Sequence, residues 1–287
     1  MTLIDIGAAG DIEPRWKQIS KILNYVGFEP DARSRVNTIS RAKECKEYII
    51  HPIAIWSYKG SLPIRLAKKS EVSSYFPINK DFVAKFPDSN RFEQTSIEDI
   101  PCDTLDNLCI TGPSFIKLDI QGGELAAILG AQATMSECLG FELEVEFTDL
   151  YVGQPIFGQI SKHLKQYGFE LYDFTNLCRW ERDSLSGLGQ IVFGDALFLR
   201  TPEGVLSANP NNQTLSSYLG ILVLYNRFDL ITYIGKNLKN DQELQYRNFI
   251  LAASKFRKDF DRVNLLIRGI NAFFKILKPT FKLHLLN

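Results

Sequence analysis

Apolar runs and segments of helical periodicity alternate along the first two hundred residues of the chain. Runs rich in β-branched and aromatic residues predict strands, and apolar residues three or four positions apart predict helices. The predicted strands are Thr2–Ile6, Phe28–Asp31, Glu47–Ile55, Leu62–Leu66, Ser114–Ile120, Phe141–Phe147, Phe169–Phe174 and Ala196–Arg200. The predicted helices are Pro14–Val26, Ser34–Cys45, Glu124–Leu129 and Ile156–Tyr167.

This order of elements is typical of an α/β fold. Strands that alternate with helices predict a mostly parallel sheet covered on both faces. The last two strands are separated by a loop alone, so we expect an antiparallel hairpin at one edge. Residues 61–100 are ambiguous, and beyond one strand we expect mostly loop. Within them, Ser73–Pro77 is a candidate substrate-side lid, because long irregular segments are often functional, and an ordinary surface loop is the alternative.

The distribution of charge divides the chain into two parts. Residues 1–204 carry 21 basic and 28 acidic side chains, a net charge of −7, whereas residues 205–287 carry 12 and 5, a net charge of +7. Loop-forming Pro, Asn and Ser residues cluster at Thr201–Gly204 and Ser207–Asn212. We therefore predict one domain at residues 1–204 and a basic helical extension at residues 205–287.

Composition excludes several classes of protein. Lys plus Arg and Asp plus Glu both number 33, so the whole-protein basic footprint of a nucleic-acid binder is missing. The five cysteines form no CxxC pair, which argues against a zinc site and for a reducing compartment. The N-terminus lacks a secretory pattern and no run of about 18 apolar residues occurs, so we expect a soluble, cytoplasmic protein.

A glycine-bearing turn follows the first predicted strand, at Gly7 and Gly10. Such a turn lets backbone N–H groups approach a ligand, and Glu29 at the end of the next strand is placed to accept hydrogen bonds from a ribose diol. The spacing is Gly-x-x-Gly rather than the Gly-x-Gly-x-x-Gly of dinucleotide folds. Asp5, just before the turn, suits a sulfonium ligand and repels a pyrophosphate. The pattern favours S-adenosylmethionine over NAD, and a plain turn without a ligand is the alternative.

With these residues the sequence resembles the FkbM family of S-adenosylmethionine-dependent methyltransferases, over about residues 3–200. The segments that carry the resemblance are Asp5–Asp11, Phe28–Asp31, Phe115–Glu124, Glu142–Phe147, Gly168–Leu171 and Gly194–Phe198. The resemblance implies the class I methyltransferase Rossmann-like fold, an α/β fold with a seven-stranded, mostly parallel sheet in the order 3-2-1-4-5-7-6. It also implies O-methylation of a hydroxyl on a sugar, another glycan or a secondary metabolite.

The resemblance further implies which residues bind the cofactor. Asp5, Gly7 and Gly10, with Ala8 between them, would line the methionine moiety. Glu29 would hold the ribose hydroxyls, with Pro30 beside it. Residues after the third strand, among them Ala54, would lie near adenine. Asp119 would also contact the cofactor.

Four residues are candidates for the base that removes the acceptor proton: Asp119, Glu124, Glu146 and His51. A positioned base contributes about 10²–10⁴-fold to such a reaction. Asp119 could instead cap a helix, Glu124 could favour a helix dipole, and His51 could be a core histidine. Alternation puts Glu142, Glu144 and Glu146 on one face of a strand, and we expect Glu146 to open onto the pocket. Two acids, Asp119 and Glu146, are a weak signal for a hard cation, and we predict no required metal.

Two other functions remain open on the sequence alone: an NAD-linked oxidoreductase, and an inactive methyltransferase fold that serves as a binding module. The partner of the extension is also open. Residues 255–282 alternate basic and apolar side chains, as in an amphipathic helix. We expect this segment to dock on the methyltransferase domain or on a second copy as a homodimer, with peripheral membrane contact as the alternative.

Overall fold

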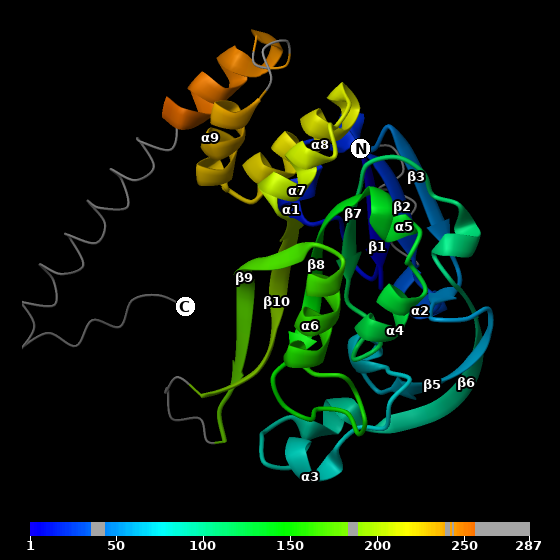
Figure 1. The fold of residues 1–287 in the computed structure, drawn as a ribbon. Coiled ribbons are helices and arrows are strands. Elements are labelled where there is room, and N and C mark those ends of the chain that lie inside the picture. The colour runs from blue at the N-terminus through cyan, green and yellow to red at the C-terminus, as the bar shows by residue number, and fades with distance from the viewer. Residues whose placement is uncertain (36–43, 183–188, 239–241, 243, 256–287) are drawn as a thin grey trace, which may run out of the picture. The chain divides into compact units, whose positions relative to one another are not determined.

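The computed structural model describes residues 1–35, 44–182, 189–238, 242 and 244–255 (Figure 1). The chain separates into two compact units, residues 1–217 and residues 218–287. The boundary falls inside α8 (Asn212–Leu224) rather than at the predicted 204/205 position. The assignment of a methyltransferase domain to residues 1–204 stays a prediction.

A seven-stranded sheet organises the first unit, and the predicted α/β fold with a seven-stranded sheet is confirmed. Its strands lie in the order β3-β2-β1-β7-β8-β10-β9, which is 3-2-1-4-5-7-6 when only the strands of this sheet are counted. The first five pair in parallel, and β10 pairs antiparallel with both β8 and β9. The bounds are β1 Thr2–Ile6, β2 Asn24–Phe28, β3 Glu47–His51, β7 Ser114–Leu118, β8 Cys138–Glu146, β9 Phe169–Trp180 and β10 Gln190–Arg200.

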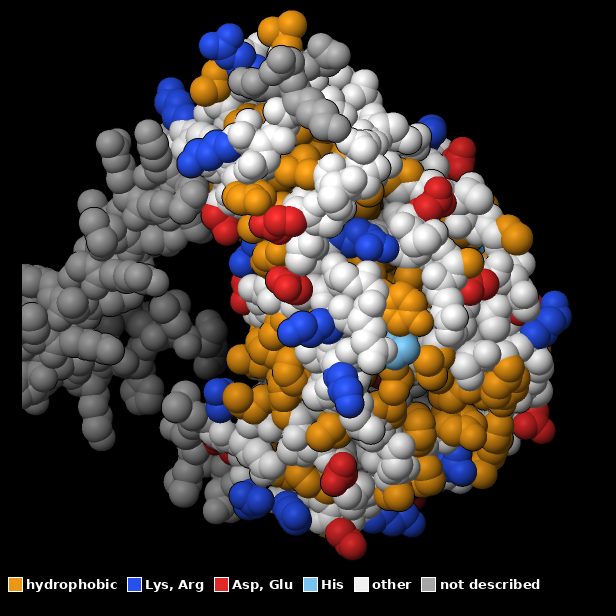
Figure 2. All heavy atoms as spheres, in the orientation of Figure 1, with side chains coloured by type: hydrophobic (Ala, Val, Ile, Leu, Met, Phe, Trp, Pro, Cys, Tyr) orange, Lys and Arg blue, Asp and Glu red, His pale blue; other side chains and the backbone are white. Residues whose placement is uncertain are grey.

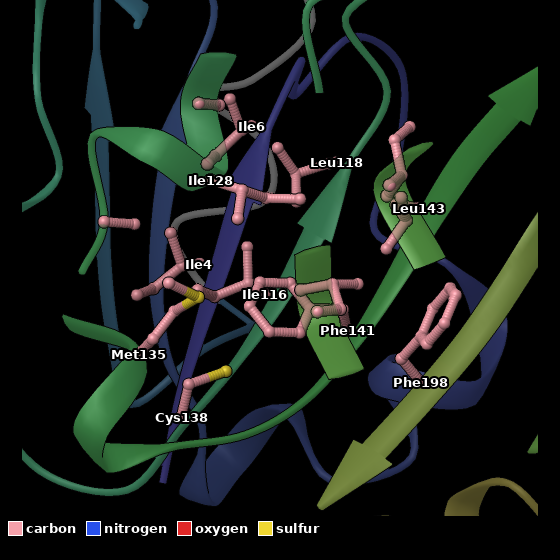
Figure 3. Packing of buried hydrophobic residues seen from close by; sticks show 14 of the residues in the cluster. Ile4, Ile6, Ile116, Leu118, Ile128, Met135, Cys138, Phe141, Leu143 and Phe198 are labelled. Carbon is pink, nitrogen blue, oxygen red and sulfur yellow. The ribbon is translucent and has the colours of Figure 1, made fainter. Parts of the chain in front are cut away.

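The register of the central strands sorts apolar and polar side chains onto opposite faces. Ile116 of β7 lies opposite Phe141 of β8, and both belong to the main hydrophobic core (Figure 3). The next pair along the strands, Lys117 and Glu142, points to the other face because side chains alternate. The main core cluster therefore occupies one face of the sheet, and a row of charged residues occupies part of the other.

Three helices cover the apolar face: α4 (Glu124–Leu129), α5 (Thr134–Glu137) and α6 (Phe157–Gln166), which Figure 1 shows in front of the sheet. On the surface seen in Figure 2, basic and acidic side chains are interspersed among exposed apolar ones. The opposite face receives the short helix α1 (Pro14–Lys17), whose Trp16 packs on Phe115 with ring centroids 5.0 Å apart. This contact lies toward the amino end of β7, and Arg15 of the same helix reaches Glu142 on the charged part of the face at 3.5 Å.

A second, three-stranded sheet arises from the region that the sequence leaves ambiguous. Its order is β4-β6-β5, with bounds β4 Ala54–Ile55, β5 Gly60–Ala67 and β6 Gln94–Asp103. The excursion between β5 and β6 contains α3 (Lys80–Val83), which begins where the Asn79 side chain accepts a hydrogen bond from the Phe82 N–H. The strand predicted at Leu62–Leu66 is confirmed as β5, whereas the expectation of mostly loop after it is wrong at β6, which pairs antiparallel with β5.

Several predicted boundaries are also wrong. The helix predicted at Pro14–Val26 ends at Lys17 and is followed by a 3-10 turn, and Val26 and Gly27 lie in β2. Pairing with β1 on one side and β3 on the other overrides the helical spacing there. The strand predicted at Glu47–Ile55 is divided into β3 and β4. The predicted hairpin of the last two strands is confirmed, with both strands longer than expected.

The carboxyl-terminal part of the chain is helical as far as it is described. After α7 (Pro202–Ser207) come α8, α9 (Phe228–Asn237) and a helical stretch at 244–255. The amphipathic segment 255–282 lies almost wholly outside the described residues, and so does most of the helix predicted at Ser34–Cys45. None of the helices in the described ranges combines the length and the apolar character needed to cross a lipid bilayer.

Replacement of Gly7 by alanine is expected to destabilise the first unit strongly. Gly7 has a φ of 84°, and a Cβ there would collide with the carbonyl oxygen of Asp119. Gly10 is a matched control, since its φ of 81° is similar but a Cβ would meet no atom within 4 Å. Urea unfolding should show a loss of about 3 kcal/mol for Gly7→Ala and about 1 kcal/mol for Gly10→Ala. Equal losses would contradict the close approach of β1 to the end of β7.

Candidate functional site

The carboxyl ends of β1, β2 and β7 meet at one edge of the sheet and border a cavity of about 230 Å³. In open α/β sheets this edge is where ligands bind. Gly7 follows β1, Glu29 follows β2 and Asp119 follows β7, and all three line the cavity. The small sheet closes the remaining side. We refer to this space as the first cavity.

The wall that the small sheet provides is apolar and aromatic. Trp56 and Tyr75 line the cavity, with their ring centroids 4.9 Å apart. Aliphatic side chains complete this wall: Ile53, Ile55, Leu62, Ile64, Leu66 and Ile100. Such a surface suits a flat heteroaromatic ring, which stacks on aromatic side chains and buries apolar area.

Glu29 supplies a carboxyl group at the border between this apolar wall and the glycine turn. Its Oε1 accepts a hydrogen bond from the Asp31 N–H at 2.7 Å, which holds the side chain in place. Glu29 is only 6% exposed, and burial raises its pKa to about 7, against the opposing effect of the Asp31 hydrogen bond. A buried carboxyl group with one fixed oxygen is well suited to accept hydrogen bonds from ligand hydroxyls.

Asp119 is held at the other end of the cavity by the side chain of Gln121. The Gln121 amide donates to Asp119 Oδ1 at 2.9 Å and to Glu144 Oε1 at 2.7 Å, and its oxygen accepts from the Tyr151 hydroxyl at 2.7 Å. Gln121 itself has a φ of 55°, in the left-handed region, and its carbonyl accepts from the Ser74 hydroxyl. The turn after β7 is thus tied to β8 and to the excursion of the small sheet.

Lys117 lines the same cavity from within β7. Its Nζ lies 3.8 Å from Asp5 Oδ1, and the charge of Asp5 is the largest cause that raises the pKa of Lys117. The other oxygen of Asp5 accepts a hydrogen bond from the Tyr25 hydroxyl at 2.6 Å. Asp5 is therefore directed to neighbouring strands, and Lys117 stays charged at the cavity wall.

A second cavity of about 280 Å³ lies on the charged face of the sheet. It shares Lys117 and Asp119 with the first cavity. Its walls are polar apart from one leucine: Glu13, Arg15, Lys117, Leu118, Asp119, Glu142, Glu144, Thr175, Asn176 and Asp195. The two cavities together form the candidate site.

Two of the predicted base candidates, Glu124 and Glu146, are fully buried and line neither cavity. Our expectation that Glu146 opens onto the pocket is wrong: Glu142 and Glu144 do so instead. Burial raises the pKa of Glu146, and the nearby Glu124 raises it further. Burial also raises the pKa of Glu124 to about 7, although its Oε1 accepts from the Ile120 N–H. Such groups are protonated more readily than ordinary carboxylates, and Glu124 fixes the backbone after Asp119.

Of the predicted cofactor-binding residues, the structure brings five together around the first cavity: Gly7, Glu29, Pro30, Ala54 and Asp119. It leaves Asp5, Ala8 and Gly10 outside the lining. His51 is also outside, because its ring stacks on Phe28 with centroids 5.0 Å apart.

Comparison with protein families gives a match to the methyltransferase FkbM domain over residues 13–171, more than half of the chain. The chain belongs to the FkbM methyltransferase family. Among solved structures, a methyltransferase FkbM from Methylobacillus flagellatus KT is similar, with 14% sequence identity and a TM-score of 0.40. The likeness covers 69% of this chain but only 43% of that one, and it adds nothing to the assignment. No curated protein sequence matches this chain.

Sequence reasoning missed several lining residues of this FkbM protein. Lys117 had a usable signal, since it is a charged residue inside an apolar strand. Asn176 and Asp195 are brought to the site only by long-range strand pairing, since β10 places Asp195 opposite Glu144 of β8 and opposite Asn176 of β9. Among the described residues, no group of three or more His, Cys, Asp or Glu side chains is arranged to hold a metal ion.

The amide of Gln121 gives a test of this geometry. Gln121→Glu places a third carboxyl group beside Asp119 and Glu144, and burial and like charges raise its pKa in the folded state. The folded protein then binds more protons than the unfolded chain, so stability falls as pH rises. Urea unfolding should show a loss of about 2 kcal/mol at about pH 8 and a smaller loss at about pH 5. The exposed control Gln166→Glu should change little at either pH, and an equal loss at both pH values for Gln121→Glu would contradict the network.

Proposed function

We propose that this chain is an S-adenosylmethionine-dependent O-methyltransferase that methylates a hydroxyl of a sugar, another glycan or a secondary metabolite. Membership of the FkbM family supports the methyltransferase part. The observation that carries the cofactor is the first cavity, where an apolar, aromatic wall is followed by the Glu29 carboxyl group after β2, the glycine turn after β1 and Asp119 after β7. A nucleoside with a positively charged tail has the same order of chemical groups.

The residues around the first cavity fit this cofactor. The apolar wall with Trp56 and Tyr75 suits adenine, and the Glu29 carboxyl group suits the two ribose hydroxyls. Lys117 and Asp119 carry opposite charges and match the carboxylate and the ammonium of the methionine moiety. When bound, S-adenosylmethionine supplies an electrophilic methyl group on a sulfonium.

The protein contributes position and a proton acceptor. Asp119 lines both cavities, so its carboxylate is placed to accept the proton of an acceptor hydroxyl that lies in the second one. Gln121 donates to Oδ1 of Asp119 and keeps the carboxylate oriented. Orientation of reactants alone can account for a large part of such an acceleration. Of the four base candidates, Asp119 is the one that the lining of the cavities favours.

The alternatives of an NAD-linked oxidoreductase and an inactive binding module are separated by ligand titration. S-adenosylhomocysteine should bind, whereas NADH should not, because its pyrophosphate would lie at the glycine turn and there meet Asp119, which follows β7 beside Gly7. A cytoplasmic location, the absence of nucleic-acid binding, and docking or dimerisation through residues 205–287 remain predictions that accompany this proposal.

Glu29→Gln is expected to weaken binding of S-adenosylhomocysteine by about tenfold at neutral pH, because a charged acceptor for two hydroxyls is lost. In the unaltered protein, the affinity should also rise between about pH 6 and about pH 8, as Glu29 with its pKa of about 7 loses its proton. Isothermal titration measures both effects. The exposed control Glu93→Gln should keep the affinity and its pH dependence. If the affinity of Glu29→Gln still rose between about pH 6 and about pH 8, the pH dependence would come from a group other than Glu29.

Asp119→Asn is expected to reduce methyl transfer by about 10²–10⁴-fold, because the proton acceptor is lost. The measurement is transfer of labelled methyl from S-adenosylmethionine into extracts of the source cell, followed by identification of the labelled product. Asp99→Asn, on the exposed β6, is the control. If Asp119→Asn transferred methyl as fast as the control, Asp119 would not be the base.

A further inference from the structure

We propose that the second cavity is the acceptor site, and that it selects a small, hydroxyl-rich, non-aromatic acceptor that carries no negative charge. This inference rests on the proposed function, because it assigns the second substrate of the same reaction. Four observations support it: the position of the cavity, the polarity of its walls, its unneutralised acids and its size.

The second cavity adjoins the first, because the two share part of one wall. Lys117 and Asp119 line both cavities, so ligands in the two spaces contact the same two side chains. Methyl transfer requires direct contact between the acceptor oxygen and the methyl group, which only adjoining sites allow. The contact lies at the carboxyl end of β7, and Arg15 of α1 lines the second cavity beside it.

The polarity of the second cavity contrasts with that of the first. The first has the aromatic and aliphatic wall of the small sheet, whereas Leu118 is the sole apolar residue that lines the second. A phenol or catechol would find no aromatic side chain to stack on there. Carboxylates, a hydroxyl and amides need hydrogen-bonding partners when water is displaced, and a polyhydroxylated molecule supplies them.

The acids of the second cavity are only partly neutralised. Arg15 is already paired, with its Nε 2.7 Å from Glu13 and its Nη1 3.5 Å from Glu142. Among the described residues, no lysine or arginine forms an ion pair with Asp119, Glu144 or Asp195. The side chains that hydrogen-bond these three acids are the neutral amides of Gln121 and Asn176. Five acidic residues line the cavity against two basic ones, Arg15 and Lys117, so an anionic acceptor would meet an excess of acidic groups, whereas hydroxyl or ammonium donors would be bound.

The size of the cavity limits the part of the acceptor that it holds. A volume of about 280 Å³ lies just under the range for drug-sized ligands, so it accommodates one or two sugar-sized rings. Thr175 at its rim donates to Glu142 Oε1 at 2.5 Å and so fixes one of the acceptors that face the ligand. The cavity therefore accommodates a short polar part of the acceptor rather than a long chain.

The test uses the full chain saturated with S-adenosylhomocysteine and four probes: glucosamine, glucose, glucuronate and catechol. Binding is measured by saturation-transfer NMR and by titration. We expect glucosamine to bind most tightly, glucose more weakly, and glucuronate at least about tenfold more weakly than glucosamine. Catechol should not compete with glucosamine. Equal or tighter binding of glucuronate or catechol, or no binding of either neutral or cationic sugar, would overturn the proposal.

Variants locate the binding and separate the two proposals. Asp195 and Glu13 line only the second cavity. Asp195→Asn and Glu13→Gln should therefore each weaken the binding of glucosamine by about tenfold and leave the affinity for S-adenosylhomocysteine unchanged. Glu29→Gln, at the first cavity, should weaken the binding of S-adenosylhomocysteine and leave the affinity for glucosamine unchanged. Unchanged glucosamine affinity in both second-cavity variants would place the acceptor elsewhere while the cofactor assignment stands. Failure of S-adenosylhomocysteine to bind the unaltered chain would instead remove the proposed function itself.

Discussion

The amide of Gln121 holds two carboxylates together, one at the end of β7 and one in β8, and the geometry of the whole candidate site depends on it. Asp119 and Glu144 would repel each other at this separation if the amide did not donate to both. Because both N–H groups are used in this way, the amide oxygen must face the Tyr151 hydroxyl. The side chain of Gln121 therefore links the loop that carries Tyr151, the end of β7 and the wall shared by the two cavities.

The hydrophobic core fixes the same wall from the opposite side of the sheet. Ile116 and Phe141 are buried beneath α4, α5 and α6, and their register sets that of Lys117 and Glu142 on the other face. A slip of one residue would exchange the two sets and bury the charges in the core. The free energy gained by burying aliphatic and aromatic side chains thus determines which charged groups meet at the site, although Ile116 and Phe141 themselves line neither cavity.

The sequence predicted those features that depend on a short stretch of chain. The bounds of α4 at Glu124–Leu129 were correct, and Glu29 was correctly placed at the end of a strand, because glycine turns and apolar runs mark both locally. Val26 was misassigned because pairing with two neighbouring strands outweighed its helical spacing. Glu146 was placed on the correct face of the strand, but it is buried rather than exposed to the cavity. The alternation of apolar and polar residues indicates which face a side chain lies on, and it does not indicate what covers that face. Of the small sheet, β6 was missed because it pairs with β5 across a long excursion, whereas β5 itself was predicted at Leu62–Leu66.

The surplus of acid at the shared wall has a physical consequence for a reaction between two bound ligands. A sulfonium and a protonated amine about 4 Å apart repel by about 4 kcal/mol in surroundings of intermediate dielectric. Carboxylates between the two positions offset that cost, and burial and mutual repulsion raise the pKa of Glu144 and of Asp195 until a cation arrives. Under the proposed function, binding of the first cation lowers these pKa values and so prepares the wall for the second ligand. Burial and crowding of these acids are unfavourable for the fold, and under the same proposal cationic ligands in the two sites would offset that cost.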